Sequence, residues 1–247
     1  MSDNRSLLTI TGSDAQSFLQ GLVTNDVDKI DQGLVYAAIL TPQGKYLADF
    51  FLSRHGDGIL LDVHESLAVM LKTRLSMYKL RADVTIEDCM LHVHRGLGDA
   101  PEDAFQDPRA DTLGWRAYRP EVQADDTVDW AALQVAASVP QSGVELGPDS
   151  YILEMGFERL SGVDFRKGCY VGQEVTARMK HKTELRKGLV RVSIKGTAEP
   201  GTQITADGKP AGILHSVADG KALAYLRFNR AKGKLMAGEA EVILDEA

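Results

Sequence analysis

Residues 34–63 have the sequence LVYAAIL-TPQG-KYLADFFLSR-HGDG-ILLDV, in which three apolar stretches alternate with two short turn sequences. Pro42 stands second and Gly44 fourth in TPQG, the positions that these residues favour in a type I turn. The aromatic and branched residues of the three stretches favour strands. We therefore predict an antiparallel meander of three strands.

The flanking sequence extends the meander to an α+β fold. A strand at Leu7–Thr11 precedes a helix within residues 12–26, for which Ser13 is the expected N-cap and Gln16 the partner of a capping box. A second helix is expected over about His64–Leu80, with a further strand after it. Helices and strands mixed in this order predict α+β with a mostly antiparallel sheet.

The C-terminal part of the chain has a different pattern. One strand is expected within residues 107–120, and short helices at Asp129–Val139 and about Gly172–Lys182. From Gly188 onward, short apolar stretches alternate with Gly- and Asp-containing turns, a pattern typical of a small antiparallel barrel. We expect two domains, formed by residues 1–185 and 186–247.

The composition is that of an ordinary globular protein of 247 residues, with 44% hydrophobic and 26% charged residues. No apolar run approaches the roughly 20 residues that a membrane-spanning helix needs. The first residues resemble neither a secretory signal nor an Arg-rich presequence. We expect a soluble cytoplasmic protein without a membrane partner, or a mitochondrial matrix protein if the chain is a processed eukaryotic form.

Charge is unevenly distributed along the chain. The formal net charge of −7 argues against direct nucleic-acid binding. Residues 166–191, however, contain eight Lys and Arg against two Glu. This basic stretch is either a solvated helix face or a binding surface for an anionic ligand or partner.

The stretch KGCYVGQE, residues 167–174, is the strongest candidate for chemistry. Two glycines flank a Cys-Tyr pair just before a predicted helix, so the backbone can bend tightly and expose the thiol of Cys169. A helix N-terminus and the neighbouring Lys167 would stabilise its thiolate. The alternative is a strand-to-helix turn with a packed cysteine. A base for Cys169 is suggested only by residue type, with His181 and His215 as candidates.

Four other side chains have two interpretations each. Asp49 is either an outward-facing polar residue of its strand or a carboxylate directed into a cleft. Trp130 is either a core anchor at a helix start or a cover for a flat ring such as a pterin. His92 and His94 share a strand face and form either a surface pair or part of a metal site; we expect no metal.

Several segments together resemble the YgfZ family of folate-binding proteins, relatives of the glycine-cleavage T-protein (aminomethyltransferase). KGCYVGQE is similar to the signature of that family, which includes mitochondrial factors that mature [4Fe–4S] proteins. Further similar blocks occur in the expected order: TITGSDAQSFLQGLVTNDV (9–27), YAAILTPQGKYLADFFL (36–52), Tyr78–Arg81, DPRADTLGWR (107–116) and GVDFRKGCYVGQEVTARMKHK (162–182).

The resemblance implies an aminomethyltransferase-like folate-binding domain over 1–185 and a β-barrel domain over 186–247. It implies a reduced folate, such as tetrahydrofolate, as cofactor, and iron–sulfur assembly or client proteins, including tRNA-modifying enzymes, as partners. The implied functional residues are Cys169 and Lys167, with Trp130 against the folate. The motif residues Tyr170, Gly172, Gln173 and Glu174 complete the site, and Arg178 in the basic stretch would meet the glutamate tail of the folate or an acidic partner.

Three hypotheses follow from the resemblance. The first is a folate-binding accessory factor for assembly or repair of iron–sulfur proteins that acts through Cys169. The second is a folate-dependent aminomethyl or methyl transferase with Asp49 as acid/base. In true aminomethyltransferases an acidic pair stands there, whereas here Ala48 precedes Asp49, so a complete glycine-cleavage activity is not expected. The third is a docking scaffold that does not bind folate.

Overall fold

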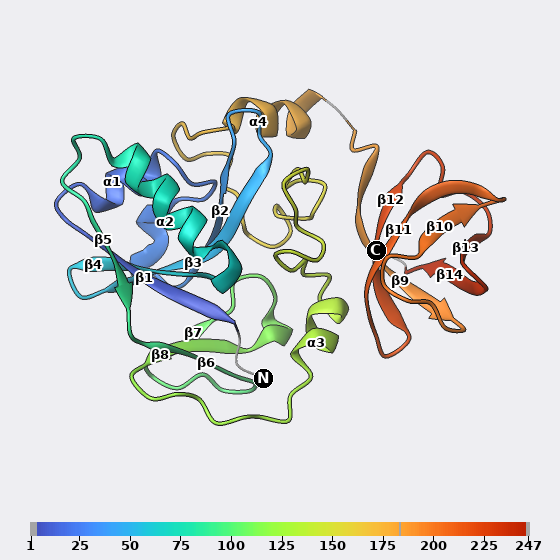
Figure 1. The fold of residues 1–247 in the computed structure, drawn as a ribbon, viewed down its shortest axis with the longest axis horizontal. Coiled ribbons are helices and arrows are strands. Elements are labelled where there is room, and N and C mark those ends of the chain that lie inside the picture. The colour runs from blue at the N-terminus through green and yellow to red at the C-terminus, as the bar shows by residue number, and fades with distance from the viewer. Residues whose placement is uncertain (1–3, 183, 246–247) are drawn as a thin grey trace. The chain divides into compact units, whose positions relative to one another are not determined.

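The computed structural model describes residues 4–182 and 184–245. They form two compact units that are interleaved along the chain (Figure 1). The first unit contains the chain up to Thr127 together with Phe157–Ala177, and the second contains Val128–Gly156 together with the chain from Arg178 onward. The predicted domain border after residue 185 stays a prediction.

The first unit is built on a five-stranded antiparallel sheet in the order β2-β3-β4-β1-β5. The predicted meander is confirmed, because its three stretches form consecutive neighbours of this sheet. The strands are β1 (Arg5–Thr11), β2 (Val35–Leu40), β3 (Tyr46–His55), β4 (Gly58–His64) and β5 (Thr85–Cys89).

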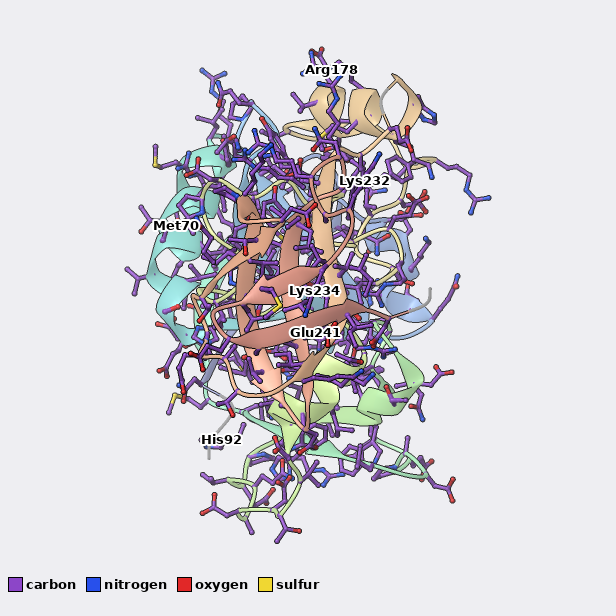
Figure 2. All side chains as sticks on the ribbon, turned by 90° about the vertical axis from the view of Figure 1, so that its right-hand side faces the viewer. Met70, His92, Arg178, Lys232, Lys234 and Glu241 are labelled. Carbon is purple, nitrogen blue, oxygen red and sulfur yellow. The ribbon has the colours of Figure 1, made fainter. Side chains whose placement is uncertain are left out.

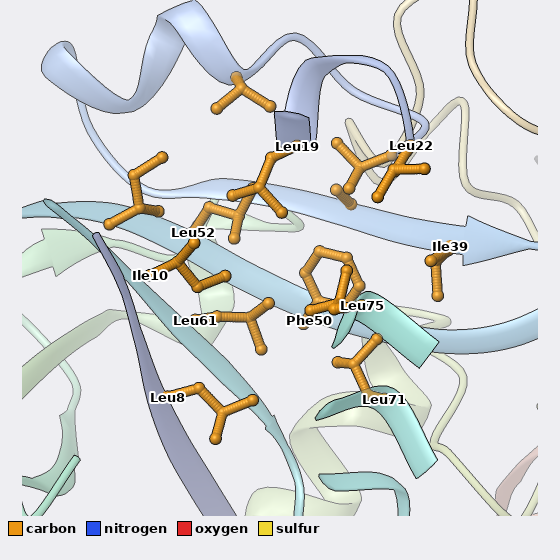
Figure 3. Close-up of a cluster of buried hydrophobic side chains, with 14 of the residues drawn as sticks. Leu8, Ile10, Leu19, Leu22, Ile39, Phe50, Leu52, Leu61, Leu71 and Leu75 are labelled. Atoms are coloured by element: carbon orange, nitrogen blue, oxygen red, sulfur yellow. The ribbon is translucent and has the colours of Figure 1, made fainter. Parts of the chain in front are cut away.

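One face of this sheet carries the main hydrophobic core, shown in Figure 3. Alternate residues of each strand point to this face, as in Leu8 and Ile10 of β1. Two helices cover it, α1 (Ala15–Gln20) and α2 (Glu65–Lys79). Leu19, Leu71 and Leu75 are the fully buried side chains of these helices. The two predicted helices are therefore confirmed.

The start of α1 differs from the prediction, and the capping box is wrong. Asp14 is the N-cap residue and makes no capping hydrogen bond with its side chain. The Ser13 hydroxyl instead donates to Asp83 Oδ2 at 2.8 Å, and the Gln16 amide donates to Asp28 Oδ1 at 2.6 Å. Tertiary hydrogen bonds thus replace the local ones that the spacing suggested.

A small antiparallel sheet, in the order β6-β8-β7, also belongs to the first unit. It contains the strand predicted within 107–120. Its strands are β6 (His92–Gly96), β7 (Phe105–Gln106) and β8 (Trp115–Arg119), and two short 3-10 helices complete the unit, η1 (Val27–Asp31) and η2 (Asp111–Leu113).

The second unit contains the predicted barrel, which is closed, with its strands in the order β10-β11-β12-β9-β14-β13. The strands are β9 (Lys187–Lys195), β10 (Gln203–Ala206), β11 (Lys209–Ala218), β12 (Lys221–Arg227), β13 (Leu235–Ala237) and β14 (Ala240–Leu244). Its core is formed by inward-facing aliphatic side chains such as Val192, Leu214 and Leu226. The helix α3 (Trp130–Ala136) packs against β11 and β12.

Side chains from residues 141–156, the segment just before the chain returns to the first unit, hold that segment to the barrel. Buried Glu145 accepts hydrogen bonds from the Ser216 hydroxyl at 2.6 Å and from the Ser216 amide at 3.1 Å. The Tyr225 hydroxyl donates to Glu154 Oε2 at 2.5 Å. These hydrogen bonds explain why residues 141–156 belong to the second unit.

Candidate functional site

The KGCYVGQE stretch forms an irregular loop that leads into α4 (Gln173–Lys182). Two side chains fix it. The Lys167 ammonium is buried and donates to the backbone carbonyls of Gln20 at 2.7 Å and Val23 at 2.5 Å. It also lies 5.1 Å from the centre of the buried Tyr170 ring. Lys167 is thus an anchor that ties the loop to the end of α1.

Burial affects the ionisation of both anchors. It lowers the pKa of Lys167 to about 8, although the carboxylates of Asp26 and Asp164 oppose this shift. It raises the pKa of the Tyr170 phenol, an effect that a hydrogen bond with Thr176 reduces. The loop before Lys167 is held as well, because Lys29 and Asp164 form an ion pair at 2.6 Å.

A close backbone contact joins the same loop to the β2–β3 turn. Gly172 has a φ of +84°, and a Cβ atom placed on it would lie 2.6 Å from the carbonyl oxygen of Thr41. Gly44, in the TPQG turn, has a φ of +73°, and a Cβ there would lie 2.7 Å from Val175 Cβ. Both positions therefore need glycine, since a side chain would separate the loop from the turn.

Cys169 is exposed and not disulfide-bonded. It follows Gly168. A Cβ atom added to Gly168 would have no atom within 4 Å apart from those of the glycine and its two chain neighbours. The thiol thus stands at an open position between two buried anchors, and the alternative of a packed cysteine is wrong. An exposed thiol on a fixed loop can bind a metal ion of a client or attack an electrophile as its thiolate.

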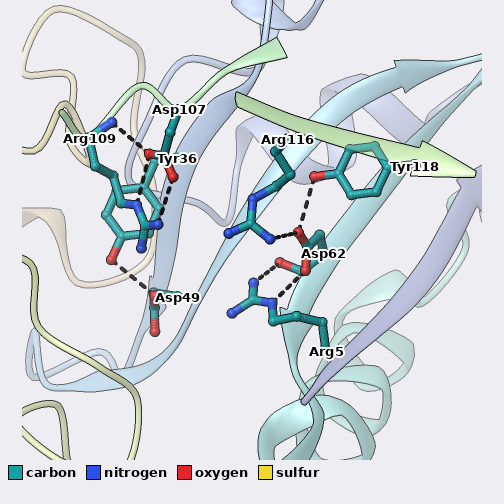
Figure 4. A network of polar contacts seen from close by, with 8 residues as sticks. All are labelled: Arg5, Tyr36, Asp49, Asp62, Asp107, Arg109, Arg116 and Tyr118. Atoms are coloured by element: carbon teal, nitrogen blue, oxygen red, sulfur yellow. Dashed lines mark hydrogen bonds and ion pairs between the residues drawn. The ribbon is translucent and has the colours of Figure 1, made fainter. Parts of the chain in front are cut away.

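Asp49 lies on the other face of the large sheet and is buried. Its Oδ2 accepts a hydrogen bond from Tyr36 at 3.0 Å, and its Oδ1 accepts one from Tyr46 at 2.6 Å (Figure 4 shows the first). Ile39 pairs with Ala48 but Leu40 pairs with Tyr46, so Leu47 is an extra residue in β3. This bulge brings Tyr46 to the face of Asp49. The outward-facing interpretation of Asp49 is therefore wrong.

A buried ionic network on the same face was not predicted (Figure 4). Asp62 of β4 forms ion pairs with Arg5 at 2.6 Å and Arg116 at 3.1 Å, and accepts a hydrogen bond from Tyr118. Burial would raise the pKa of the Asp62 carboxyl, but the two guanidinium groups outweigh it and hold that pKa below its usual range. The sequence signal was a single carboxylate, Asp62, inside the apolar strand β4.

The neighbouring Asp107–Arg109 pair belongs to this face as well. Arg109 donates to Asp107 at 2.7 Å, and its guanidinium lies 5.4 Å from the centre of the Tyr36 ring. Arg109 and Arg116 both stack on Phe51, at 4.7 and 4.5 Å from the ring centre. Paired charges and aromatic rings thus make this face rigid around Asp49.

The remaining predicted binding residues lie around α3 and α4. Glu174 and Arg178 are exposed and Gln173 is half-buried, all on α4, and Trp130 is half-buried at the start of α3. A folate has a flat pteridine ring and a tail of carboxylates. The indole of Trp130 and the guanidinium of Arg178 are chemically suited to these two groups.

Two further predicted features are located by the structure. His92 is exposed and His94 half-buried on β6, where His94 Nε2 lies 2.7 Å from the Glu121 carbonyl oxygen. Among the described residues, no three His, Cys, Asp or Glu side chains are grouped as a metal site requires. His215 lies on β11, where burial lowers its pKa. A base for Cys169 stays a prediction.

The sequence is similar to curated proteins over nearly its whole length. It is 31% identical to the mitochondrial iron–sulfur cluster assembly factor IBA57 of Mus musculus, over 94% of this chain and 78% of that protein. It is 28% identical to the tRNA-modifying protein YgfZ of Shigella sonnei, over 76% of this chain and 69% of that protein. The chain belongs to the IBA57–YgfZ family. The predicted YgfZ resemblance is thereby confirmed.

Two further matches place the fold of this IBA57–YgfZ family member. The model of the CAF17 C-terminal β-barrel domain matches residues 186–246. The glycine cleavage system aminomethyltransferase T from Bartonella henselae has a similar structure, with a TM-score of 0.78 and 13% identity over 99% of this chain and 83% of that chain. The predicted fold class, an aminomethyltransferase-like α+β fold with a C-terminal barrel, is confirmed. Among the described residues no helix is long and apolar enough to span a membrane.

Proposed function

We propose that this chain is an accessory factor for the assembly or repair of iron–sulfur proteins, and that it acts through the thiol of Cys169. The observation that carries the proposal is the exposed cysteine held between buried Lys167 and Tyr170. Membership in a family with an iron–sulfur cluster assembly factor supports it. The partners are then iron–sulfur assembly or client proteins, including tRNA-modifying enzymes.

In this proposal the loop presents the thiol and does not bury it. Lys167 is occupied by two backbone carbonyls, so its part is to hold the loop and to place a positive charge near it. Gly172 lets the loop lie against the β2–β3 turn. A thiolate at such a position can transiently coordinate an iron atom of a client. It can also attack the outer sulfur of a client's persulfide, so that the persulfide passes to Cys169 and the client's cysteine leaves as a thiolate.

The test of Cys169 is complementation of a strain that lacks its own family member. Cys169→Ser is expected to abolish the recovery of a [4Fe–4S] enzyme activity, with unchanged unfolding in urea. Cys89→Ser is the matched control, because Cys89 is the other thiol and is half-buried on β5. Full recovery of activity with Cys169→Ser would refute the proposal.

We further propose that the chain binds a reduced folate. Trp130 would cover the pteridine ring, and Arg178 would meet the glutamate carboxylates. Bound folate would supply or accept a one-carbon unit. The aminomethyltransferase-like fold supports this assignment.

Tetrahydrofolate titration followed by tryptophan fluorescence tests it, because the chain has two tryptophans. Trp130→Phe is expected to remove the ligand-dependent quenching, whereas Trp115→Phe keeps it. If tetrahydrofolate causes no saturable change in the fluorescence of a folded protein, the folate proposal is refuted. The proposal for the Cys169 thiol would still stand, because complementation tests it separately.

A folate-dependent aminomethyl or methyl transferase is the second candidate, favoured by the buried carboxylate of Asp49. Both of its oxygens accept phenol hydrogens, which holds the carboxylate in place. This candidate predicts turnover with an aminomethyl or methyl donor and its loss in Asp49→Asn. Turnover that is absent in the wild-type protein while folate binds would exclude it.

A docking scaffold without folate is the third candidate, for which the basic stretch 166–191 is the proposed surface. It predicts capture of an iron–sulfur carrier protein that weakens with salt, together with no folate affinity. The mouse relative is described as mitochondrial. For this chain, a cytoplasmic or a matrix location stays a prediction, as does the absence of direct nucleic-acid binding.

A further inference from the structure

The short helix α3, which begins at Trp130, has a hydrogen bond from a side chain at each of its ends. At its start, the Asp129 carboxylate accepts a hydrogen bond from the Ala132 amide at 2.9 Å. At its end, the guanidinium of Arg191 on β9 donates to the backbone carbonyl of Ala136. The first bond is local to the helix, whereas the second joins the helix to a strand of the barrel.

The bond from Arg191 satisfies a backbone group at the open end of the helix. The last carbonyls of a helix have no donor within the helix and need one from elsewhere. The backbone amides that follow α3 bond to the carbonyls of Leu133, Gln134 and Val135. The Arg191 guanidinium binds the next carbonyl, that of Ala136. A positive charge is favourable at this end of a helix.

The guanidinium of Arg191 is itself oriented by a carboxylate. Its Nε donates to Asp245 Oδ2 at 2.6 Å, and the Asp245 amide donates to the Arg191 carbonyl at 3.4 Å. The Ser193 hydroxyl donates to Asp245 Oδ1 at 2.6 Å, and Lys221 Nζ lies 3.1 Å from Oδ2. Glu241, labelled in Figure 2, lies on β14, the strand that leads to Asp245. Because a guanidinium is a rigid planar fork, fixing its Nε also fixes the direction of Nη1.

The bond at the end of α3 also constrains the start of the helix. The seven residues of α3 extend over only about 10 Å at 1.5 Å per residue, so the helix moves as one body. Its Val135 side chain is buried, and the helix packs against β11 and β12. Packing alone allows the helix to rotate about Val135, whereas the hydrogen bond from β9 opposes that rotation. The half-buried indole of Trp130 is therefore constrained as well.

We propose that Arg191 and Asp245 are positioning residues, which hold α3 so that the indole of Trp130 can cover the pteridine ring of a reduced folate. This inference rests on the proposed folate binding through Trp130. Contacts between flat rings depend on the distance and the angle between their planes, so a tilted indole binds the ring less well. Asp245 acts through Arg191, and Arg191 acts through the backbone of α3.

Tryptophan fluorescence in a Trp115→Phe background tests the position of α3 without any ligand. The chain has two tryptophans, so Trp130 alone emits in this background. Arg191→Gln should shift its emission to longer wavelength and increase its quenching by acrylamide, because a released helix exposes the indole. Asp245→Ala should have the same effect, since it removes the carboxylate that orients Arg191.

Two control variants separate positioning from other effects. Arg230→Gln is the matched change, because Arg230 also donates to a backbone carbonyl, that of Pro210, in the loop between β12 and β13. It should leave the emission of Trp130 unchanged. Ile204→Val removes a methyl group from the barrel core, so it should lower the urea midpoint without changing the emission.

Tetrahydrofolate titration of the same proteins tests the effect on binding. Arg191→Gln should raise the dissociation constant about tenfold, the equivalent of one lost hydrogen bond to a charged group. Arg191→Lys keeps the charge but lacks the planar fork, so it should bind as weakly as Arg191→Gln. The Arg230→Gln and Ile204→Val variants should bind as tightly as the parent protein.

The possible results distinguish this inference from the folate proposal. If the parent protein shows no saturable tetrahydrofolate signal, the folate proposal fails and this inference fails with it. If the parent protein binds and Arg191→Gln binds equally well, this inference alone is overturned. It is overturned as well if Ile204→Val weakens binding as much as Arg191→Gln does, because the loss would then follow stability.

Discussion

Replacing Gly172 by alanine should destabilise the first unit, whereas the same change at Gly168 should not. Gly172 has a φ of +84°, where a Cβ costs about 1–2 kcal/mol. The new methyl group would also lie 2.6 Å from the Thr41 carbonyl oxygen, and relieving such overpacking costs about 1–3 kcal/mol. The sum is about 2–5 kcal/mol of unfolding free energy for Gly172→Ala.

Gly168→Ala is the matched control within the same motif. No atom lies within 4 Å of a Cβ built there, so its effect should stay within about 0.5 kcal/mol. Urea unfolding measures the stability of both variants. The rate at which a thiol reagent modifies Cys169 reports whether the loop has moved. Equal stability of the two variants, or a larger loss at Gly168, would refute the reasoning about the contact with the β2–β3 turn.

Three further predictions concern buried or paired charges. Lys167→Met deprives two backbone carbonyls of their donor and should cost about 2–3 kcal/mol in urea unfolding, whereas no loss would contradict its role as anchor. Asp62→Asn leaves the buried guanidinium of Arg116 and the half-buried one of Arg5 without their carboxylate and should cost about 3–5 kcal/mol, against almost nothing for Asp57→Asn in the exposed turn. Hydrogen bonds from Ser193, Arg191 and Lys221 lower the pKa of Asp245 to about 2, so its stabilisation of the barrel is present above about pH 4 and is lost as pH falls towards 2. Asp245→Asn should make the melting temperature less dependent on pH in that range. A pH dependence equal to that of the wild-type protein would contradict the assignment.

The strands, the two main helices and the barrel could be predicted because each has a strong local signal. In β1 to β4 the apolar stretches, separated by the turn sequences TPQG and HGDG, agree with the tertiary structure. The short strand β13 was missed, since its three residues LMA carry no alternation of their own. The capping box failed for a different reason. Ser13 bonds to Asp83, which is 70 residues away and beyond the reach of any local pattern.

The environment of Asp49 could not be predicted, because both faces of the large sheet are covered. When one face of a sheet meets solvent, polar residues identify it, but β2 is buried at all six positions. Alternation then cannot distinguish the core face from the polar face. The bulge at Leu47 adds a second difficulty, since it brings Tyr46 to the face of Asp49 against the two-residue period.

The loop that carries the thiol and the hairpin that carries the buried carboxylate meet at the β2–β3 turn, and each group is held by its own contacts. The loop of Cys169 lies against the TPQG turn through Gly172, and Asp49 follows that turn within β3. Hydrogen bonds of Lys167 hold the loop to the end of α1, whereas hydrogen bonds from Tyr36 and Tyr46 hold Asp49 in its buried position. A ligand that uses both groups would therefore meet each of them already held in place, and a change in the β2–β3 turn would act on both, since Gly172 contacts that turn and Asp49 follows it in β3.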